Sequence, residues 1–212
     1  MSVPFIIYGL PRSRTKWLST LLTYGDIECI HEASIFVHSI EEMLHLFHSD
    51  NVGFSDTAFS YGHALIRHFV PNVREVVIFR PVEEVMASIK KIDVSDVAIY
   101  DFALLERNMR YGERCLYKIA QKPDVLVVNY KDLDNEEVCK EIFEHCLPEV
   151  FDRSHWLNLK DRNVQVNFKA VLSYYLANRE KIDKFKRDCK VELRNLAKAG
   201  LLKTETKQRF YA

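Results

Sequence analysis

The chain has 212 residues, of which 48% are hydrophobic and 12% aromatic, a composition that is ordinary for a globular protein and sufficient for one sizeable core. Its 30 basic and 30 acidic residues balance, which argues against a general nucleic-acid binder. No apolar run reaches the roughly 18 to 20 residues of a membrane span, and the apolar start lacks the features of a secretory signal, so we expect a soluble cytoplasmic protein with no membrane partner.

The first elements predict a phosphate-binding loop. Residues 3–8 are apolar and predict a buried strand, Gly9 and Pro11 indicate a turn, and apolar residues at helical spacing predict a helix over residues 15–24. The free backbone N–H groups at such a helix start favour an anion. Positive charges and hydroxyl groups lie together in the turn and the helix start, on Arg12, Ser13, Arg14, Thr15 and Lys16.

This loop departs from the ordinary P-loop pattern G-x-x-x-x-G-K-[ST]. Counted from Gly9, Arg14 stands at the second glycine, Thr15 at the lysine, and Lys16 at the residue that would hold magnesium. The sequence therefore disfavours an ATP or GTP hydrolase.

Two strands and two helices are predicted next, with acidic residues at the strand ends. Residues 27–30 and 52–55 read as strands, and residues 40–47 and 60–68 read as helices, the first with a capping box at Ser39 and Glu42. His31 and Glu32 follow one strand and Asp56 follows the other. A carboxylate beside an apolar wall acquires a raised pKa and becomes a useful base, and an imidazole titrates near neutral pH, so all three are candidate bases.

A second phosphate-binding motif follows the predicted strand at residues 75–79. Arg80 ends this strand and Pro81 begins a predicted helix over residues 81–91, in which Ser88 lies off the apolar stripe. In an open α/β sheet a side chain at the carboxyl end of a strand faces the ligand crevice, so Arg80 is placed to bind a phosphate.

The remaining elements complete an α/β pattern. Helices are predicted over residues 96–120 and 135–146, a strand over residues 125–129, and a helical C-terminal third after Pro148. Strands alternating with helices predict a three-layer sandwich with a mostly parallel central sheet, folded as a single domain over residues 1–212. Five cysteines without a C-x-x-C pair, and histidines without further ligands near them, predict reduced thiols and no metal site.

The two motifs together resemble the superfamily of sulfotransferases that use 3′-phosphoadenosine 5′-phosphosulfate (PAPS). The segment that starts at Gly9 is similar to the family's 5′-phosphosulfate loop, G-x-P-[RK]-S-G-T-T-x-L, and Arg80 with Ser88 is similar to its 3′-phosphate pair. A weaker similarity, to the family's Y-E-D-L segment, begins at Tyr130. The resemblance covers residues 1 to about 135.

The resemblance implies a PAPS-dependent transfer of a sulfuryl group to an acceptor hydroxyl or amine, with 3′,5′-phosphoadenosine (PAP) as product. It implies Glu32 as the first choice of base and His31 as the second, with Asp56 as an alternative. Because residues 52–57 lack the family's lysine, Lys16 or Arg12 would have to stabilise the departing phosphate. The cofactor-binding residues that it implies are Arg12, Ser13, Arg14, Thr15, Lys16, Trp17, Arg80, Ser88, Tyr130 and Arg162.

The chain also departs from the family pattern. Arg14 replaces a glycine, Lys16 replaces a threonine, and residues 52–57 lack the lysine that many members place there. A noncatalytic protein that binds PAP or another nucleotide is therefore a second hypothesis, and a nucleoside or nucleotide kinase is a third. The acceptor is expected to be a small molecule or a carbohydrate, with Phe36, Phe54, Phe59 and Tyr61 as candidate aromatic contacts.

Overall fold

The computed structural model, which describes residues 4–92, 101–164 and 167–202, contains a five-stranded sheet in which every strand runs the same way. The strand order is β2-β3-β1-β4-β5. The five strands are β1 (Phe5–Gly9), β2 (Glu28–His31), β3 (Val52–Asp56), β4 (Arg74–Phe79) and β5 (Val125–Asn129). The predicted α/β fold is confirmed, and each strand lies within two residues of its predicted range, except that residue 3 lies outside the described residues.

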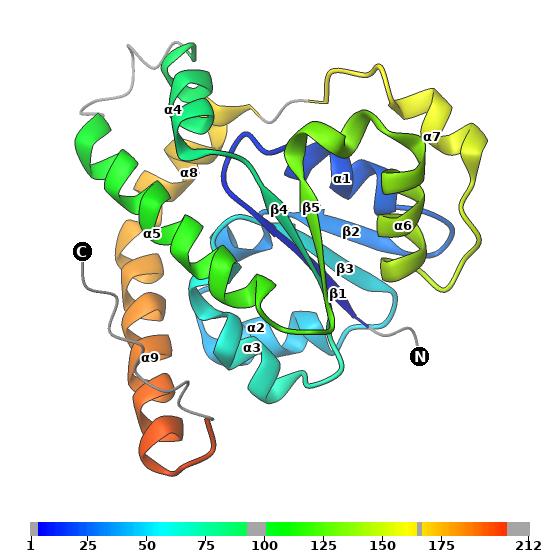
Figure 1. Ribbon diagram of the computed structural model, residues 1–212. Coiled ribbons are helices and arrows are strands. Elements are labelled where there is room, and N and C mark those ends of the chain that lie inside the picture. The colour runs from blue at the N-terminus through cyan, green and yellow to red at the C-terminus, as the bar shows by residue number, and fades with distance from the viewer. Residues whose placement is uncertain (1–3, 93–100, 165–166, 203–212) are drawn as a thin grey trace.

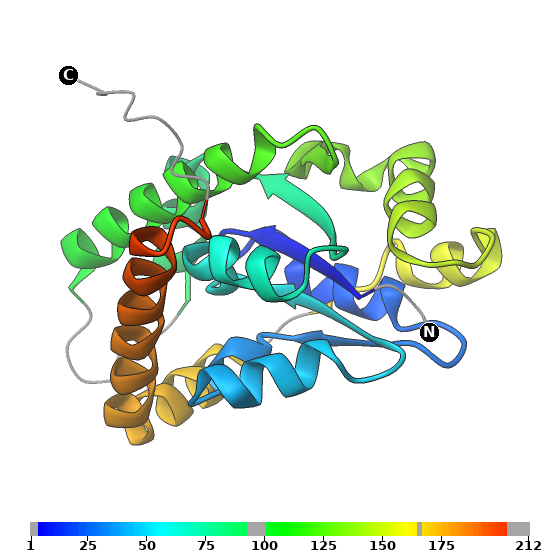
Figure 2. The same ribbon diagram turned by 90° about the horizontal axis from the view of Figure 1, so that it is seen from below.

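Helices cover both faces of this sheet, as Figure 1 shows. One face packs against α1 (Thr15–Leu22), α6 (Glu136–Cys146) and α7 (Arg153–Leu159). The opposite face packs against α2 (Ile40–Phe47), α3 (His63–Phe69), α4 (Val82–Lys90), α5 (Phe102–Ala120) and α9 (Arg179–Lys198). In both views α9 lies at the opposite side of the molecule from α7 (Figures 1 and 2), and α8 (Phe168–Ala177) precedes it.

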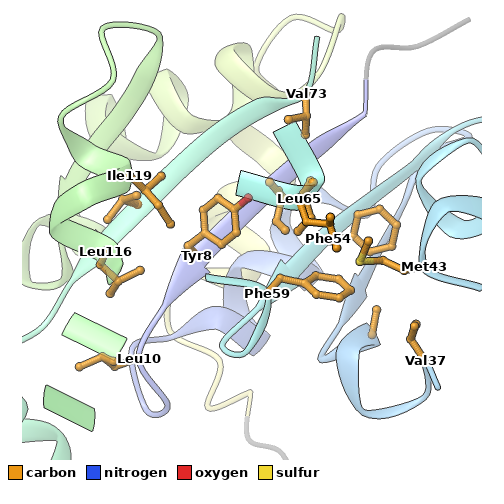
Figure 3. Packing of buried hydrophobic residues seen from close by; sticks show 14 of the residues in the cluster. Tyr8, Leu10, Val37, Met43, Phe54, Phe59, Leu65, Val73, Leu116 and Ile119 are labelled. Atoms are coloured by element: carbon orange, nitrogen blue, oxygen red, sulfur yellow. The ribbon is translucent and has the colours of Figure 1, made fainter. Parts of the chain in front are cut away.

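The central strand β1 supplies both cores because its side chains alternate between the two faces. Ile6 and Tyr8 pack into the cluster shown in Figure 3, beneath α2, α3 and α5, whereas Phe5 and Ile7 pack beneath α1 and α6. The Tyr8 hydroxyl is buried and donates a hydrogen bond to Glu75 Oε1 at 2.8 Å. A strand that is apolar on both sides is thus fixed at the centre of the sheet.

The position of β1 opens a crevice at the carboxyl ends of the strands. After β1 the chain turns into α1 on one face, whereas after its neighbours β3 and β4 the chain packs on the opposite face. Neighbouring strands whose connections leave to opposite faces form the crevice in which open α/β sheets bind ligands. The loop after β1 and the start of α4 lie at this crevice, which brings the two predicted motifs together.

Some predicted helix boundaries are wrong by a few residues. The helix expected from residue 60 begins with a 3₁₀ turn, η2 (Phe59–Gly62), and the α-helix starts at His63. Pro81 caps α4 with an extended ψ of 136° instead of lying inside it. Helix α5 begins after Asp101, whose carboxylate accepts hydrogen bonds from Ala103 N and Leu104 N. Residues 96–100 of the predicted helix lie outside the described residues.

Within the described ranges, no helix combines the length and apolar character needed to cross a bilayer.

Helix α2 begins at the predicted capping box, where Ser39 Oγ accepts a hydrogen bond from Glu42 N at 3.0 Å. The Glu42 carboxylate reaches back to His38 N at 2.7 Å, one residue before the usual partner.

Gly53 in β3 provides a test of the packing between β3 and β1. A Cβ added to Gly53 would lie 2.0 Å from the nearest atom of the Phe5 ring, so Gly53→Ala must displace a buried ring. We expect this variant to lower the free energy of unfolding by about 2 kcal/mol in urea denaturation. Gly62→Ala is the matched control, because a Cβ there meets no atom within 4 Å. Equal stability of the two variants would contradict the packing described.

Candidate functional site

The loop between β1 and α1 has the open backbone of an anion-binding turn. Arg12 and Arg14 both adopt left-handed conformations, with φ of 67° and 61°, and Arg14 is the residue that precedes α1. Its side chain makes no capping hydrogen bond, so in the described chain the first-turn N–H groups lack a side-chain acceptor. A Cβ on Gly9 would approach Thr15 Cγ2 to 3.2 Å, so glycine lets the loop fold closely against the helix start.

Two polar side-chain atoms in this region are buried without a hydrogen-bond partner among the described residues. Ser13 is fully buried and its Oγ is unsatisfied. The Nε of Arg80 is also buried and unsatisfied, since Glu84 Oε2 at 3.8 Å is beyond hydrogen-bond distance. Buried polar atoms without partners are rare in folded proteins, and a bound ligand is one way of satisfying them.

The two phosphate-binding motifs contact each other directly. Arg12 Nε donates to Ser88 Oγ at 3.1 Å, and the Arg80 guanidinium donates to the Arg12 carbonyl oxygen. The same guanidinium lies 4.1 Å from the centre of the Tyr130 ring, on the 3₁₀ turn η3 (Tyr130–Asp134). Four residues predicted to bind the cofactor, far apart in sequence, therefore form one cluster.

Arg14 and Trp17 are committed to contacts within the protein. Arg14 Nη1 lies 2.5 Å from Asp134 Oδ1, and its guanidinium carbon lies 4.4 Å from the centre of the Trp17 ring. Trp17 is 2% exposed, and its indole N–H donates to the Leu159 carbonyl at 2.9 Å. Trp17 thus supports the loop from the core, and its ring offers little surface to a ligand.

His31 is linked to the phosphate loop. Its Nε2 lies 3.1 Å from Thr15 Oγ1, and the Thr15 carbonyl accepts a hydrogen bond from Ser55 Oγ at 2.8 Å. Burial, with a smaller contribution from the positive charge of Lys16, lowers the pKa of His31 to about 4. His31 is therefore neutral at physiological pH, so its contact with Glu32 Oε1 at 3.6 Å is not an ion pair there.

Glu32 has a carboxyl group with a raised pKa. Burial, assisted by the negative charge of Asp56, raises its pKa to about 8, although Thr57 Oγ1 donates to Glu32 Oε2 at 2.9 Å. Its backbone is left-handed, with φ of 55°. Three of the four non-glycine residues at positive φ in the described chain are predicted site residues, namely Arg12, Arg14 and Glu32. Such strain tends to concentrate at functional sites.

Asp56 is engaged by the backbone, which makes it a poor candidate for the base. Its carboxylate accepts hydrogen bonds from Ser34 N at 2.8 Å, Ala58 N at 2.8 Å and Phe59 N at 3.0 Å. Burial raises the pKa of Asp56, and these donors oppose the rise because they stabilise the ionised form. Asp56 organises the chain around Glu32 and has both carboxylate oxygens occupied.

Lys16 and Arg162 lie apart from the Arg12–Arg80 cluster, on a pocket of about 740 Å³. The pocket is formed by α1, β2 and α7, and His31 also lines it. Arg80 and Ser88 do not. Of the ten predicted cofactor-binding residues, Lys16 and Arg162 line this pocket and the other eight do not. Lys16 follows Thr15 in the chain, so it lies between the phosphate loop and the pocket.

Sequence reasoning missed several residues of this site. Thr57 and Ser55 flank Asp56, and their hydroxyl groups next to a strand-end carboxylate were a usable signal. Asp134 gave no local signal, because its partner Arg14 is far away in sequence. The candidate acceptor contacts Phe54 and Phe59 are 0% and 4% exposed and belong to the core, whereas Phe36 and Tyr61 are 55% and 40% exposed.

In the ranges that the structure describes, no group of three or more His, Cys, Asp or Glu residues is arranged to hold a metal ion. Neither the protein-family models nor the curated proteins include a match to the chain.

The conformation of Arg14 can be tested by comparing two substitutions. Arg14→Gly and Arg14→Ala both remove the contacts with Asp134 and Trp17, but only alanine keeps the strain of a left-handed residue. We expect the glycine variant to be more stable by about 1 kcal/mol in urea denaturation. At Arg110, inside α5, the same pair of substitutions should give the opposite order, since glycine weakens a helix interior.

Glu32 should make stability depend on pH. Above pH 4.5 the unfolded chain releases a proton that the folded protein keeps up to about pH 8, so the free energy of unfolding falls as the pH rises through this window. His31, with its lowered pKa, contributes the opposite slope below pH 6.5. Between pH 6.5 and about 8 we therefore expect the wild type to lose stability and Glu32→Gln to lose clearly less. If the free energy of unfolding, measured in urea, changed with pH in the same way in the two proteins, the raised pKa of Glu32 would be refuted.

Proposed function

We propose that this protein is a PAPS-dependent sulfotransferase, which moves a sulfuryl group from PAPS to a hydroxyl or amine of an acceptor. One observation carries the proposal: the loop after β1 and the motif after β4 interlock through Arg12, Ser88 and Arg80. A ligand with phosphate groups on the 3′ and the 5′ oxygen of one ribose can be held by two such strand-to-helix junctions at adjacent strands. The strand order, with β1 beside β4, supplies them.

The residues at these junctions fit a doubly phosphorylated nucleotide. The uncapped start of α1 and the unsatisfied Ser13 hydroxyl suit the 5′-phosphosulfate, and Arg80 with Ser88 suits the 3′-phosphate. Arg12 joins the two, because it belongs to the loop and hydrogen-bonds Ser88. Tyr130 holds the Arg80 guanidinium by stacking, which lowers the entropy lost when the arginine binds.

Glu32 is the proposed base. PAPS supplies the activated sulfuryl group, and the protein must remove a proton from the acceptor. A general base works best when its pKa lies near the operating pH, which favours Glu32 at about 8 over His31 at about 4. The neutral His31 instead holds Thr15, and Lys16 is proposed to stabilise charge on the departing phosphate.

A noncatalytic nucleotide-binding protein is the second candidate. Arg14, which stands where the resembling family has a glycine, is tied to Asp134 and Trp17, and residues 52–57 lack the lysine that many family members place there. In this alternative Arg12, Arg80 and Ser88, called the nucleotide clamp below, bind a nucleotide, and Glu32 has no role in a reaction.

The clamp predicts selectivity for a 3′-phosphate. In isothermal titration calorimetry, the wild type should bind adenosine 3′,5′-bisphosphate at least about tenfold more tightly than adenosine 5′-monophosphate, since one charge-assisted hydrogen-bonded pair contributes about 1.5–3 kcal/mol. Arg80→Met should abolish most of this difference while retaining binding of the monophosphate. Arg110→Met, which removes an exposed arginine on α5, is the control and should keep the selectivity.

Other outcomes separate the alternatives. Equal affinity of the wild type for the two nucleotides would remove the basis for the proposed enzyme. Tight, magnesium-dependent binding of ATP with no preference for a 3′-phosphate would favour a kinase. Selective binding of the bisphosphate, without transfer of labelled sulfate from PAPS to any acceptor and without an effect of Glu32→Gln, would favour the noncatalytic candidate.

A further inference from the structure

The pocket between α1, β2 and α7 is separate from the nucleotide clamp but reaches the phosphate loop. Its volume of about 740 Å³ is large enough for a monosaccharide or a larger molecule. Arg80 and Ser88 do not line it, whereas Lys16 and His31 do, and both of these lie next to Thr15. The pocket therefore opens where the proposed reaction takes place.

Helix α7 runs antiparallel to α1 and fixes which end of the pocket Arg162 occupies. At the start of α7, His155 Nε2 lies 3.1 Å from the carbonyl oxygen of Leu21, near the end of α1. At the end of α7, the Leu159 carbonyl accepts hydrogen bonds from the Trp17 indole and from the Arg162 backbone N–H, both at 2.9 Å. Arg162 is thus held beside the first turn of α1, the same turn that carries Lys16.

The charges in the pocket are distributed unevenly. Neither Lys16 nor Arg162 makes a side-chain hydrogen bond or an ion pair with another residue of the described chain, and both line the pocket. The acidic residue of the lining, Glu28, begins β2, while His31 ends it. Three residues along a strand span about 10 Å, so Glu28 lies well away from the end of β2 that adjoins the loop. The loop end of the pocket is therefore positive.

We infer that this pocket holds the acceptor, and that the acceptor is a polar, hydroxyl-bearing molecule with an anionic group of its own: a carboxylate, a phosphate or a sulfate. This inference rests on the proposed function. Arg162 binds the anionic group, and Lys16, at the loop end of the pocket, remains available to the departing phosphate, which places the acceptor hydroxyl near the phosphate loop. Thr20, Asn158 and His155 give the rest of the lining hydrogen-bonding groups that suit a sugar ring better than a lipid or a phenol. Arg162 is then a contact of the acceptor and not of the nucleotide.

The test measures binding of four probes by titration with NMR detection: glucuronate, glucose 6-phosphate, glucose and inorganic sulfate. The two charged sugars should bind at least about tenfold more tightly than glucose, and more tightly than sulfate, because both charge and ring contribute. Arg162→Gln should remove most of the preference for charged over neutral sugar and leave the affinity for adenosine 3′,5′-bisphosphate unchanged. Arg187→Gln is the matched control, since Arg187 is exposed on α9, at the other side of the molecule from α7.

Four results would overturn the inference: no binding of either charged sugar, sulfate binding as tightly as the charged sugars, an unchanged preference in Arg162→Gln, or a fall in bisphosphate affinity in that variant. The last of these would return Arg162 to the nucleotide site. Failure of the proposed function is distinguishable, because it would appear as loss of selective bisphosphate binding in the wild type, whatever the sugars do.

Discussion

The contact between Arg12 and the β4–α4 junction is the constraint on which the candidate site depends. β1 and β4 are adjacent in the sheet, yet the chain leaves them toward opposite faces. Their two following segments would diverge if nothing held them together. Arg12 joins them twice, since its side chain donates to Ser88 and its carbonyl accepts from Arg80. The crevice at the centre of the sheet consequently has a fixed width and a fixed set of positive charges.

A second group of contacts places two carboxyl groups, the fully buried Asp56 and the partly buried Glu32, on the other side of β1. Burial raises the pKa of both groups, but three backbone N–H donors oppose the rise at Asp56, whereas at Glu32 the opposing donor is Thr57. Asp56 therefore serves as a structural anchor, and Glu32 resists ionisation until mildly alkaline pH. This division of roles between neighbouring acids is what a site for proton transfer needs.

The sequence predicted the parts of the protein that depend on local patterns. Apolar runs placed the strands, the capping box placed α2, and the cations around Ser13 indicated the loop. The meeting of the two motifs also followed, because parallel strands bring their carboxyl ends to one edge, but the direct contact between Arg12 and Ser88 was not predicted. Contacts set by long-range packing did not follow. The partnership of Arg14 with Asp134 and the position of Arg162 both depend on how η3 and α7 pack, for which the sequence has no periodic signal.

The short turn η3 touches both halves of the site. Tyr130 at its start stacks on Arg80, and Asp134 at its end pairs with Arg14. Ordering of either arginine must therefore stiffen the same five residues, and that stiffening lowers the entropic penalty of ordering the other. The two ends of an extended ligand would then bind cooperatively without any movement of the sheet. Substitutions in η3 at residues that touch no ligand could tune this coupling, which makes the turn a place where affinity can evolve independently of chemistry.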